Sequence, residues 1–196
     1  MNTIDTHVSI RWTTWWSRFV NRVRLIGRRR HVNKVARSHK LRQKITEIAA
    51  TENGFARALG YLRKIDPLVF EELILTAVED DNLRIQRNLR YTGDGGLDGE
   101  VTYRGARVLI QAKRYGAHIQ RAHVAVFASL CALEDAVGLF VHTGRTGEAS
   151  RGAITDAGGR VLIVSGHRLI EFLTQPGSTK EHLERVITTH RRLSSC

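Results

Sequence analysis

The most constraining feature of this sequence is a pair of short apolar segments, residues 97–103 and 106–112, separated only by Arg104-Gly105. A two-residue connection that contains glycine favours a tight β-hairpin, so we expect two antiparallel strands here. In such a hairpin the start of the first strand lies beside the end of the second. A turn at Arg104-Gly105 therefore predicts that Asp98 lies almost opposite Gln111.

The segments around this hairpin alternate between strand and helix patterns. Further strands are expected at 83–89, 137–142 and 160–164, and helices at 67–80, 118–133, 147–157, 167–173 and 179–192. Consecutive strands are typical of an antiparallel meander, and strands separated by helices are typical of parallel crossovers. We therefore predict an α/β fold, in which a mixed central sheet is flanked by helices.

The first 60 residues differ from the rest in charge. The whole chain has a formal net charge of +12, and residues 1–60 hold 13 Lys or Arg against 3 Asp or Glu. This segment contains no proline, and its pattern is mainly helical, with Trp12, Trp15 and Trp16 on one apolar stripe. A basic segment of this kind suits a polyanionic partner, which means nucleic acid or an anionic membrane surface. A solvated basic tail is the alternative that requires no partner.

Contacts with DNA phosphates are the interpretation that we favour for this segment. Such contacts are largely independent of base sequence, and no helix-turn-helix or zinc-finger signature is visible. The candidate residues are basic and lie between the tryptophan-bearing stretch and residue 45: Arg28, Arg29, Arg30, Lys34, Arg37, Lys40, Arg42 and Lys44.

Two further observations bear on location. The longest apolar runs, 137–141 and 161–164, are much shorter than the roughly 20 residues that a membrane-spanning helix needs, so we do not expect a transmembrane segment. The two cysteines, Cys131 and Cys196, are too few for a disulfide scaffold or a cysteine-only metal site. We therefore expect a reducing compartment and a cytoplasmic location. The arginine-rich start also leaves an organellar transit peptide open.

Polar side chains of the kinds that bind metals and assist catalysis lie where the hairpin strands end. Strand alternation puts Gln111 and Lys113 on one face and Ala112 on the other, with Asp98 on the neighbouring strand. A hard divalent cation takes carboxylate and amide oxygens as ligands. A nearby lysine can orient the attacking water and stabilise developing negative charge. This set suits metal-assisted cleavage of a phosphodiester.

Three stretches together carry a family resemblance: Phe70-Glu-Glu-Leu73, Gly93-Asp-Gly-Gly-Leu-Asp98 and Gln111-Ala-Lys-Arg-Tyr115. In this order and spacing they resemble the catalytic domain of Mrr-type restriction endonucleases, a branch of the PD-(D/E)xK nuclease superfamily. The likeness continues to about residue 174. It implies a restriction-endonuclease-like core at 61–175, between the basic segment 1–60 and a C-terminal helix at 176–196.

The resemblance also implies a role for each matching residue. Asp98 would bind Mg²⁺ or Mn²⁺, and Gln111 stands where most of the superfamily has Asp or Glu, a substitution usual in the Mrr branch. Lys113 would be the catalytic lysine, and the backbone carbonyl of Ala112 would be a further metal ligand. Glu71 matches the helical glutamate that supports the metal or its waters.

The implied function is a Mg²⁺-dependent DNA endonuclease with a role in restriction, defence or DNA processing. Arg114 and Tyr115 follow the catalytic lysine and would contact the DNA backbone. Cutting both strands of a duplex would favour a homodimer. Two alternatives stay open: a catalytically inactive nucleic-acid-binding module on the same fold, and a membrane-surface protein anchored by the tryptophan helix.

Overall fold

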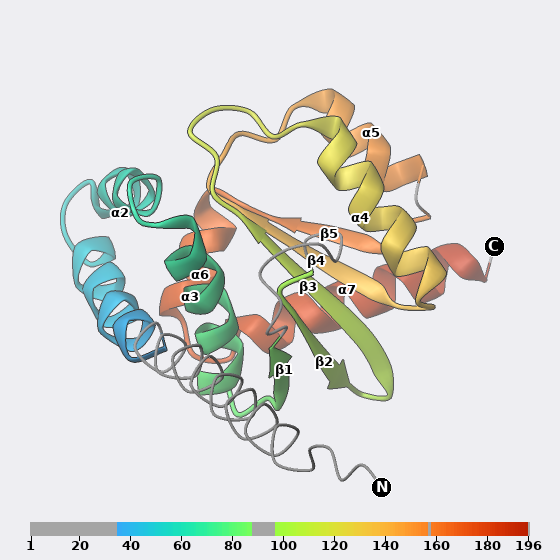
Figure 1. Ribbon diagram of the computed structural model, residues 1–196, viewed down its shortest axis with the longest axis horizontal. Helices are drawn as coiled ribbons and strands as arrows, with labels where there is room; N and C mark the ends of the chain where they lie inside the picture. The colour runs from blue at the N-terminus through green and yellow to red at the C-terminus, as the bar shows by residue number, and fades with distance from the viewer. Residues whose placement is uncertain (1–34, 88–96, 157, 196) are drawn as a thin grey trace, which may run out of the picture.

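The computed structural model describes residues 35–87, 97–156 and 158–195 (Figure 1). A single five-stranded sheet in the order β1-β2-β3-β4-β5 forms its centre. The strands are β1 (Ile85–Arg87), β2 (Gly99–Tyr103), β3 (Ala106–Lys113), β4 (Val137–His142) and β5 (Val161–Val164). Pairing is antiparallel from β1 to β3 and parallel from β3 to β5, which confirms the predicted meander followed by crossovers.

The hairpin between β2 and β3 has the predicted turn and register. Arg104 and Gly105 both have positive φ, 49° and 76°, as a type I′ turn requires. Gly99 pairs with Ile110, so the residues from Gly99 to Tyr103 follow the predicted register. Both features follow from local sequence, because a two-residue turn leaves almost no freedom in strand register.

Helices cover both faces of the sheet. The described helices are residues 35–49, α2 (Gly54–Leu62), α3 (Pro67–Asp80), α4 (Arg121–Leu133), α5 (Glu148–Asp156), α6 (His167–Thr174) and α7 (Ser178–Ser194). Side chains from α4 and α5 pack with Leu109 and Phe140 on one face. On the other face, α3, α6 and α7 pack with Val108, Ile110 and Ala112 (Figure 1). The mixed sheet flanked by helices is therefore confirmed.

Two helix starts show how the sequence sets the boundaries. Asp66 caps α3, because its side chain accepts a hydrogen bond from the Val69 amide at 3.1 Å and Pro67 occupies the first turn. The expected helix at 118–133 begins only at Arg121. Its first residues instead pair with the β4 exit, where the Ile119 amide donates to the Arg145 carbonyl at 3.1 Å. These backbone groups are therefore already hydrogen-bonded to the segment after β4 and are not part of a helical turn before Arg121.

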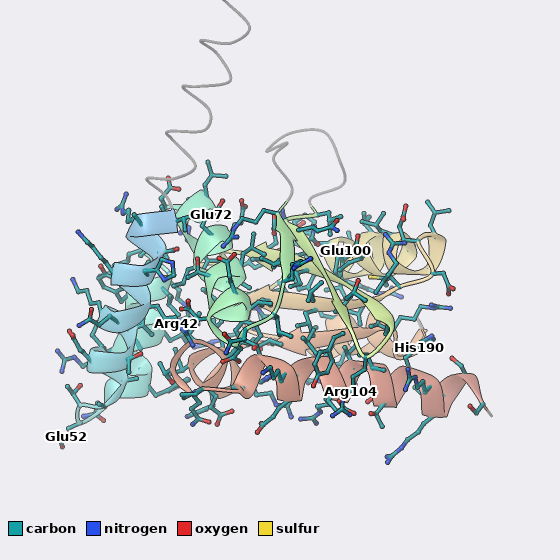
Figure 2. The ribbon with its side chains drawn as sticks, turned by 90° about the horizontal axis from the view of Figure 1, so that it is seen from below. Arg42, Glu52, Glu72, Glu100, Arg104 and His190 are labelled. Atoms are coloured by element: carbon teal, nitrogen blue, oxygen red, sulfur yellow. The ribbon has the colours of Figure 1, made fainter. Side chains whose placement is uncertain are left out.

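The described part of the basic N-terminal segment packs onto the sheet domain. Leu41 and Ile45 belong to the same apolar cluster as α3, and the Ser38 and Thr76 hydroxyls lie 2.6 Å apart. Arg42, labelled in Figure 2, donates to Asp80 Oδ2 at 2.5 Å and to the Leu173 carbonyl at 2.8 Å. Helix 35–49 therefore shares the core of the sheet domain.

The C-terminal helix is joined to the same core. Leu183, Val186 and Ile187 of α7 are buried in the cluster on the α3 face. The buried Asp81 carboxylate accepts hydrogen bonds from the amides of Gly177 and Thr179 at the start of α7. Within the described residues, no helix is both long enough and apolar enough to cross a bilayer.

Candidate active site

Asp98 lies beside β3 in the predicted neighbourhood, but not in the predicted pair with Gln111. Its amide donates at 3.0 Å to the carbonyl of Ile110, the residue that also pairs with Gly99, so the regular ladder ends at Gly99 and Asp98 is shifted by one residue from a Gln111 pair. Its carboxylate Oδ2 then accepts a hydrogen bond from the Ala112 amide at 2.6 Å. The side chain of Asp98 therefore lies against the backbone between Gln111 and Lys113.

Gln111, Ala112 and Lys113 of β3 present different chemical groups near Asp98. Gln111 is only 3% exposed, and Lys113 is half-buried. Both share the face of Leu109, whereas Ala112 points into the opposite apolar cluster. The amide and carbonyl of one residue in an antiparallel strand point to the same side. Since the Ala112 amide faces Asp98, its carbonyl also faces the Asp98 side of the strand.

The two glutamates of α3 have different surroundings. Glu72 is 3% exposed, and its Oε2 lies 3.3 Å from Arg87 Nε. Arg87 also donates twice to Glu79, at 3.0 and 2.7 Å, so the buried Glu72 carboxylate, labelled in Figure 2, belongs to an ion-pair group. Glu71 is half-buried on α3, the helix that packs on the Ala112 face. The structure therefore gives Glu72 a partner within the fold, and the role of Glu71 stays a prediction.

His142 is a neighbour of the site that the sequence patterns do not single out. It pairs with Lys113 in the parallel β3–β4 register and is fully buried. Its Nδ1 accepts a hydrogen bond from the Gly144 amide at 3.1 Å, and its Nε2 lies 3.2 Å from Thr146 Oγ1. Burial lowers the pKa of His142 to about 4. A neutral imidazole beside Lys113 adds no second positive charge there.

Tyr115 and Arg114 follow Lys113 at the end of β3. The Tyr115 hydroxyl lies 2.5 Å from His123 Nδ1, and burial raises the pKa of this phenol. The exposed Arg114 donates to the Arg63 carbonyl at 2.7 Å. Both predicted DNA-contacting residues therefore lie at the exit of the strand that carries Lys113.

The basic residues of helix 35–49 divide into two groups. Arg37, Lys40 and Lys44 are exposed, and Lys44 Nζ lies 4.7 Å from the centre of the Tyr61 ring. Arg42 instead has only 16% of its side chain exposed and holds the helix to Asp80 and Leu173. Its guanidinium is engaged within the fold rather than directed to a ligand. The other candidates, Arg28, Arg29, Arg30 and Lys34, lie outside the described residues.

The oxygen donors around Asp98 suit a hard cation. Across residues 35–87, 97–156 and 158–195, no three His, Cys, Asp or Glu side chains form a group that could hold a metal ion. The oxygen donors near Asp98 are of another kind, because its carboxylate lies against the backbone of Ala112, and Gln111 precedes Ala112 on the same strand. Mg²⁺ commonly takes one or two carboxylates from a protein and completes its shell with water and phosphate oxygens. The donors of Asp98, Gln111 and Ala112 fit that pattern.

Comparison with known families agrees with the geometry. The model of a restriction endonuclease family, the Mrr catalytic domain, matches residues 62–173, which is more than half of the chain. The chain belongs to this Mrr-type restriction endonuclease family. Among the described elements, the match includes the five strands, α3, α4, α5 and all of α6 except its last residue, and it confirms the resemblance found in the sequence. Membership assigns the chain to a family of nucleases.

The chain was also compared with curated proteins and with solved structures. No curated protein matches the chain. Among solved structures, the chain is similar to the MspJI restriction endonuclease in complex with a 27-mer oligonucleotide, with a TM-score of 0.41 and 17% sequence identity. That similarity covers 78% of this chain and 35% of the MspJI chain, so this protein corresponds to about a third of the length of that relative.

Proposed function

We propose that this Mrr-type protein is a divalent-metal-dependent DNA endonuclease that hydrolyses phosphodiester bonds. The observation that carries the proposal is the hydrogen bond from the Ala112 amide to Asp98 Oδ2. It brings a carboxylate next to the strand segment that supplies the amide of Gln111, the carbonyl of Ala112 and the amine of Lys113. Family membership supports the same chemistry.

Each residue then has a defined task. Asp98, Gln111 and the Ala112 carbonyl would hold Mg²⁺ or Mn²⁺, with Glu71 supporting the metal or its waters. When bound, such a cation polarises the phosphate and lowers the pKa of water. Lys113 orients the attacking water and stabilises the negative charge that develops on the phosphate. His142, whose pKa is lowered by burial, pairs with Lys113 in the β3–β4 register and adds no positive charge there.

DNA is the proposed partner. The chain carries a net charge of +12, and Arg37, Lys40 and Lys44 form an exposed basic face on helix 35–49. Lysine and arginine on such a face bind phosphates with little dependence on base sequence and with a steep dependence on salt. The proposed setting is restriction, defence or DNA processing in the cytoplasm, with a homodimer to cut both strands.

A plasmid cleavage assay tests the proposal. Supercoiled plasmid is incubated with the purified protein and Mg²⁺, Mn²⁺ or EDTA, and nicked and linear products are separated on a gel. The test variant is Lys113→Ala. The matched control is Lys180→Ala, because Lys180 lies on α7 beside Tyr103 and Arg104, at the end of the hairpin away from Lys113.

The proposal expects metal-dependent cleavage by the wild-type protein and by Lys180→Ala, and none by Lys113→Ala. A plasmid panel with differing methylation covers a requirement for modified bases. Binding of DNA without cleavage under all these conditions would instead identify a nucleic-acid-binding module on a nuclease fold. Equal loss of DNA binding and cleavage in Lys113→Ala would contradict the catalytic role of that lysine.

A further inference from the structure

The strand that carries Lys113 needs support where its regular pairing stops. Lys113 is the last residue of β3 that pairs with β4, opposite His142. The next backbone hydrogen bond, from the Thr143 amide to the Lys113 carbonyl, is long at 3.4 Å. Arg114 and Tyr115 lie beyond the strand, so other groups must hold the backbone on this side of the lysine.

The hydroxyl of Thr143 supplies that support. Thr143 Oγ1 accepts a hydrogen bond from the Tyr115 amide at 2.9 Å and donates one to the Tyr115 carbonyl at 2.8 Å. One side chain therefore satisfies both backbone groups of Tyr115. Thr143 is fully buried, so water does not compete for these bonds. The arrangement replaces the missing strand pairing with a side chain.

Arg63 ties this point to α2. It forms the C-cap of α2, and its Nε donates to the Thr143 carbonyl at 2.9 Å. In return, the carbonyl of Arg63 accepts a hydrogen bond from Arg114 at 2.7 Å. Arg63 is 51 residues from Arg114 and 80 residues from Thr143 in the sequence. Its hydrogen bonds therefore join the end of α2 to the chain segments that follow β3 and β4, next to the predicted catalytic lysine.

Close backbone contact at Gly144 leaves this junction little freedom. A Cβ added to Gly144 would lie 2.5 Å from the Ala117 carbonyl oxygen and 2.9 Å from Tyr115 Cβ. Only glycine fits between these groups, since real Cβ atoms do not approach other atoms so closely. The exits of β3 and β4 are therefore packed against each other as well as hydrogen-bonded.

From these contacts we propose that Thr143 is a positioning residue that holds the Lys113–Tyr115 segment, and that Arg63 supports it from α2. The proposal rests on the catalytic role of Lys113 given above. A group displaced by about 1 Å from its reactive position costs on the order of 10²-fold in rate. Thr143 touches neither substrate nor metal in this scheme, and it acts through the backbone of its neighbours.

Two substitutions at Thr143 distinguish a role in positioning the Lys113–Tyr115 segment from a role in stabilising the fold. Thr143→Val keeps the side-chain shape and removes both hydrogen bonds, whereas Thr143→Ser keeps the hydroxyl. Ser38→Ala is the matched control, because Ser38 is also fully buried and its hydroxyl pairs with Thr76, on helices away from the β3 exit. The measurements are the single-turnover cleavage rate, the DNA dissociation constant in EDTA, and the melting temperature.

We expect Thr143→Val to lower the single-turnover rate about 10²-fold at protein concentrations that saturate the DNA. Thr143→Ser should keep the cleavage rate within a few fold of wild type. Ser38→Ala should have a lower melting temperature than wild type but a nearly unchanged cleavage rate. Equal rate losses in Thr143→Val and Ser38→Ala would overturn the proposal. So would a failure of Thr143→Ser to keep the rate.

Hydrogen exchange at the Tyr115 amide gives a readout that does not need activity. The proposal expects protection in wild type and Thr143→Ser and faster exchange in Thr143→Val alone. If the wild type cleaves no DNA, the proposed function fails, and the exchange measurement still shows whether Thr143 holds the segment. Unchanged exchange in Thr143→Val would refute the positioning role whatever the activity.

Discussion

Replacing Asp81 with asparagine should detach the start of α7 from the end of α3. The Asp81 side chain is 7% exposed and accepts hydrogen bonds from the Gly177 amide at 2.9 Å, the Thr179 amide at 3.1 Å and the Thr179 hydroxyl. An asparagine keeps one acceptor oxygen and turns an NH₂ group toward the remaining donors. Hydrogen bonds to a charged group contribute about 1.5–3 kcal/mol each, so the loss should be about 2–4 kcal/mol.

This loss is large enough to measure by thermal unfolding. For a chain of about 200 residues, each kcal/mol shifts the melting temperature by about 2–4 °C, which predicts a decrease of about 4–16 °C for Asp81→Asn. The control is Asp135→Asn, because the Asp135 side chain is 99% exposed and should tolerate the same change. Equal melting temperatures of the two variants would refute the role of Asp81 as a link to α7.

The stabilising effect of Asp81 should also depend on pH. Burial raises the pKa of its carboxyl, but the hydrogen bonds from Thr179 and Gly177 and the charge of Arg42 outweigh burial, so the pKa lies below its ordinary value of 3.8. A lowered pKa in the folded state stabilises the protein fully above the unfolded value and loses that effect as pH falls through the folded value. The difference in unfolding free energy between wild type and Asp81→Asn should be constant from about pH 8 to 5 and shrink below about pH 4. A difference that persists unchanged at pH 3 would contradict this account.

Three shorter predictions concern the site and the core. Asp98→Asn should keep the hydrogen bond from the Ala112 amide and the wild-type melting temperature. Its metal-dependent cleavage rate, measured in single-turnover assays, should fall by at least about 10²-fold, and a near-normal rate would exclude Asp98 as a metal ligand. Arg42→Ala should destabilise the protein by about 1–3 kcal/mol in urea unfolding, because Arg42 binds Asp80 and the Leu173 carbonyl, whereas the exposed Arg37→Ala should not. Burial raises the pKa of Cys131 to about 12, so this thiol should resist alkylation by iodoacetamide at pH 8 until the protein unfolds, as mass spectrometry would detect.

The half of the site that lies in the hairpin could be predicted because its register is local. Asp98 and Gln111 are joined through a two-residue turn, and the positive φ of Arg104 and Gly105 is what that turn requires. Strand alternation then assigned Gln111 and Lys113 to one face. The neighbourhood of these three residues therefore followed from the hairpin alone, whereas the one-residue shift of Asp98 toward Ile110 did not.

The parallel half of the site could not be predicted in the same way. β3 and β4 are separated by α4 and its connections, and a crossover of that length leaves strand register undetermined by local sequence. The sequence identified Val137–His142 as a buried strand, but only the observed register places His142 beside Lys113. The same register brings Thr143 to Tyr115. The sequence therefore did not predict that either residue lies beside the Lys113–Tyr115 segment, although each position follows directly from the register of the sheet.

The N-terminal helix shows a different limit of sequence patterns. Arg37, Lys40, Arg42 and Lys44 all look like phosphate-binding candidates in a basic segment, because charge alone does not distinguish them. The structure separates Arg42 from the others, since Leu41 and Ile45 turn one face of the helix into the core and carry Arg42 to Asp80. The remaining basic residues are then held on a helix that packs into the core of the sheet domain. A DNA backbone bound there would meet a surface whose position relative to α3 is set by packing rather than by a flexible linker.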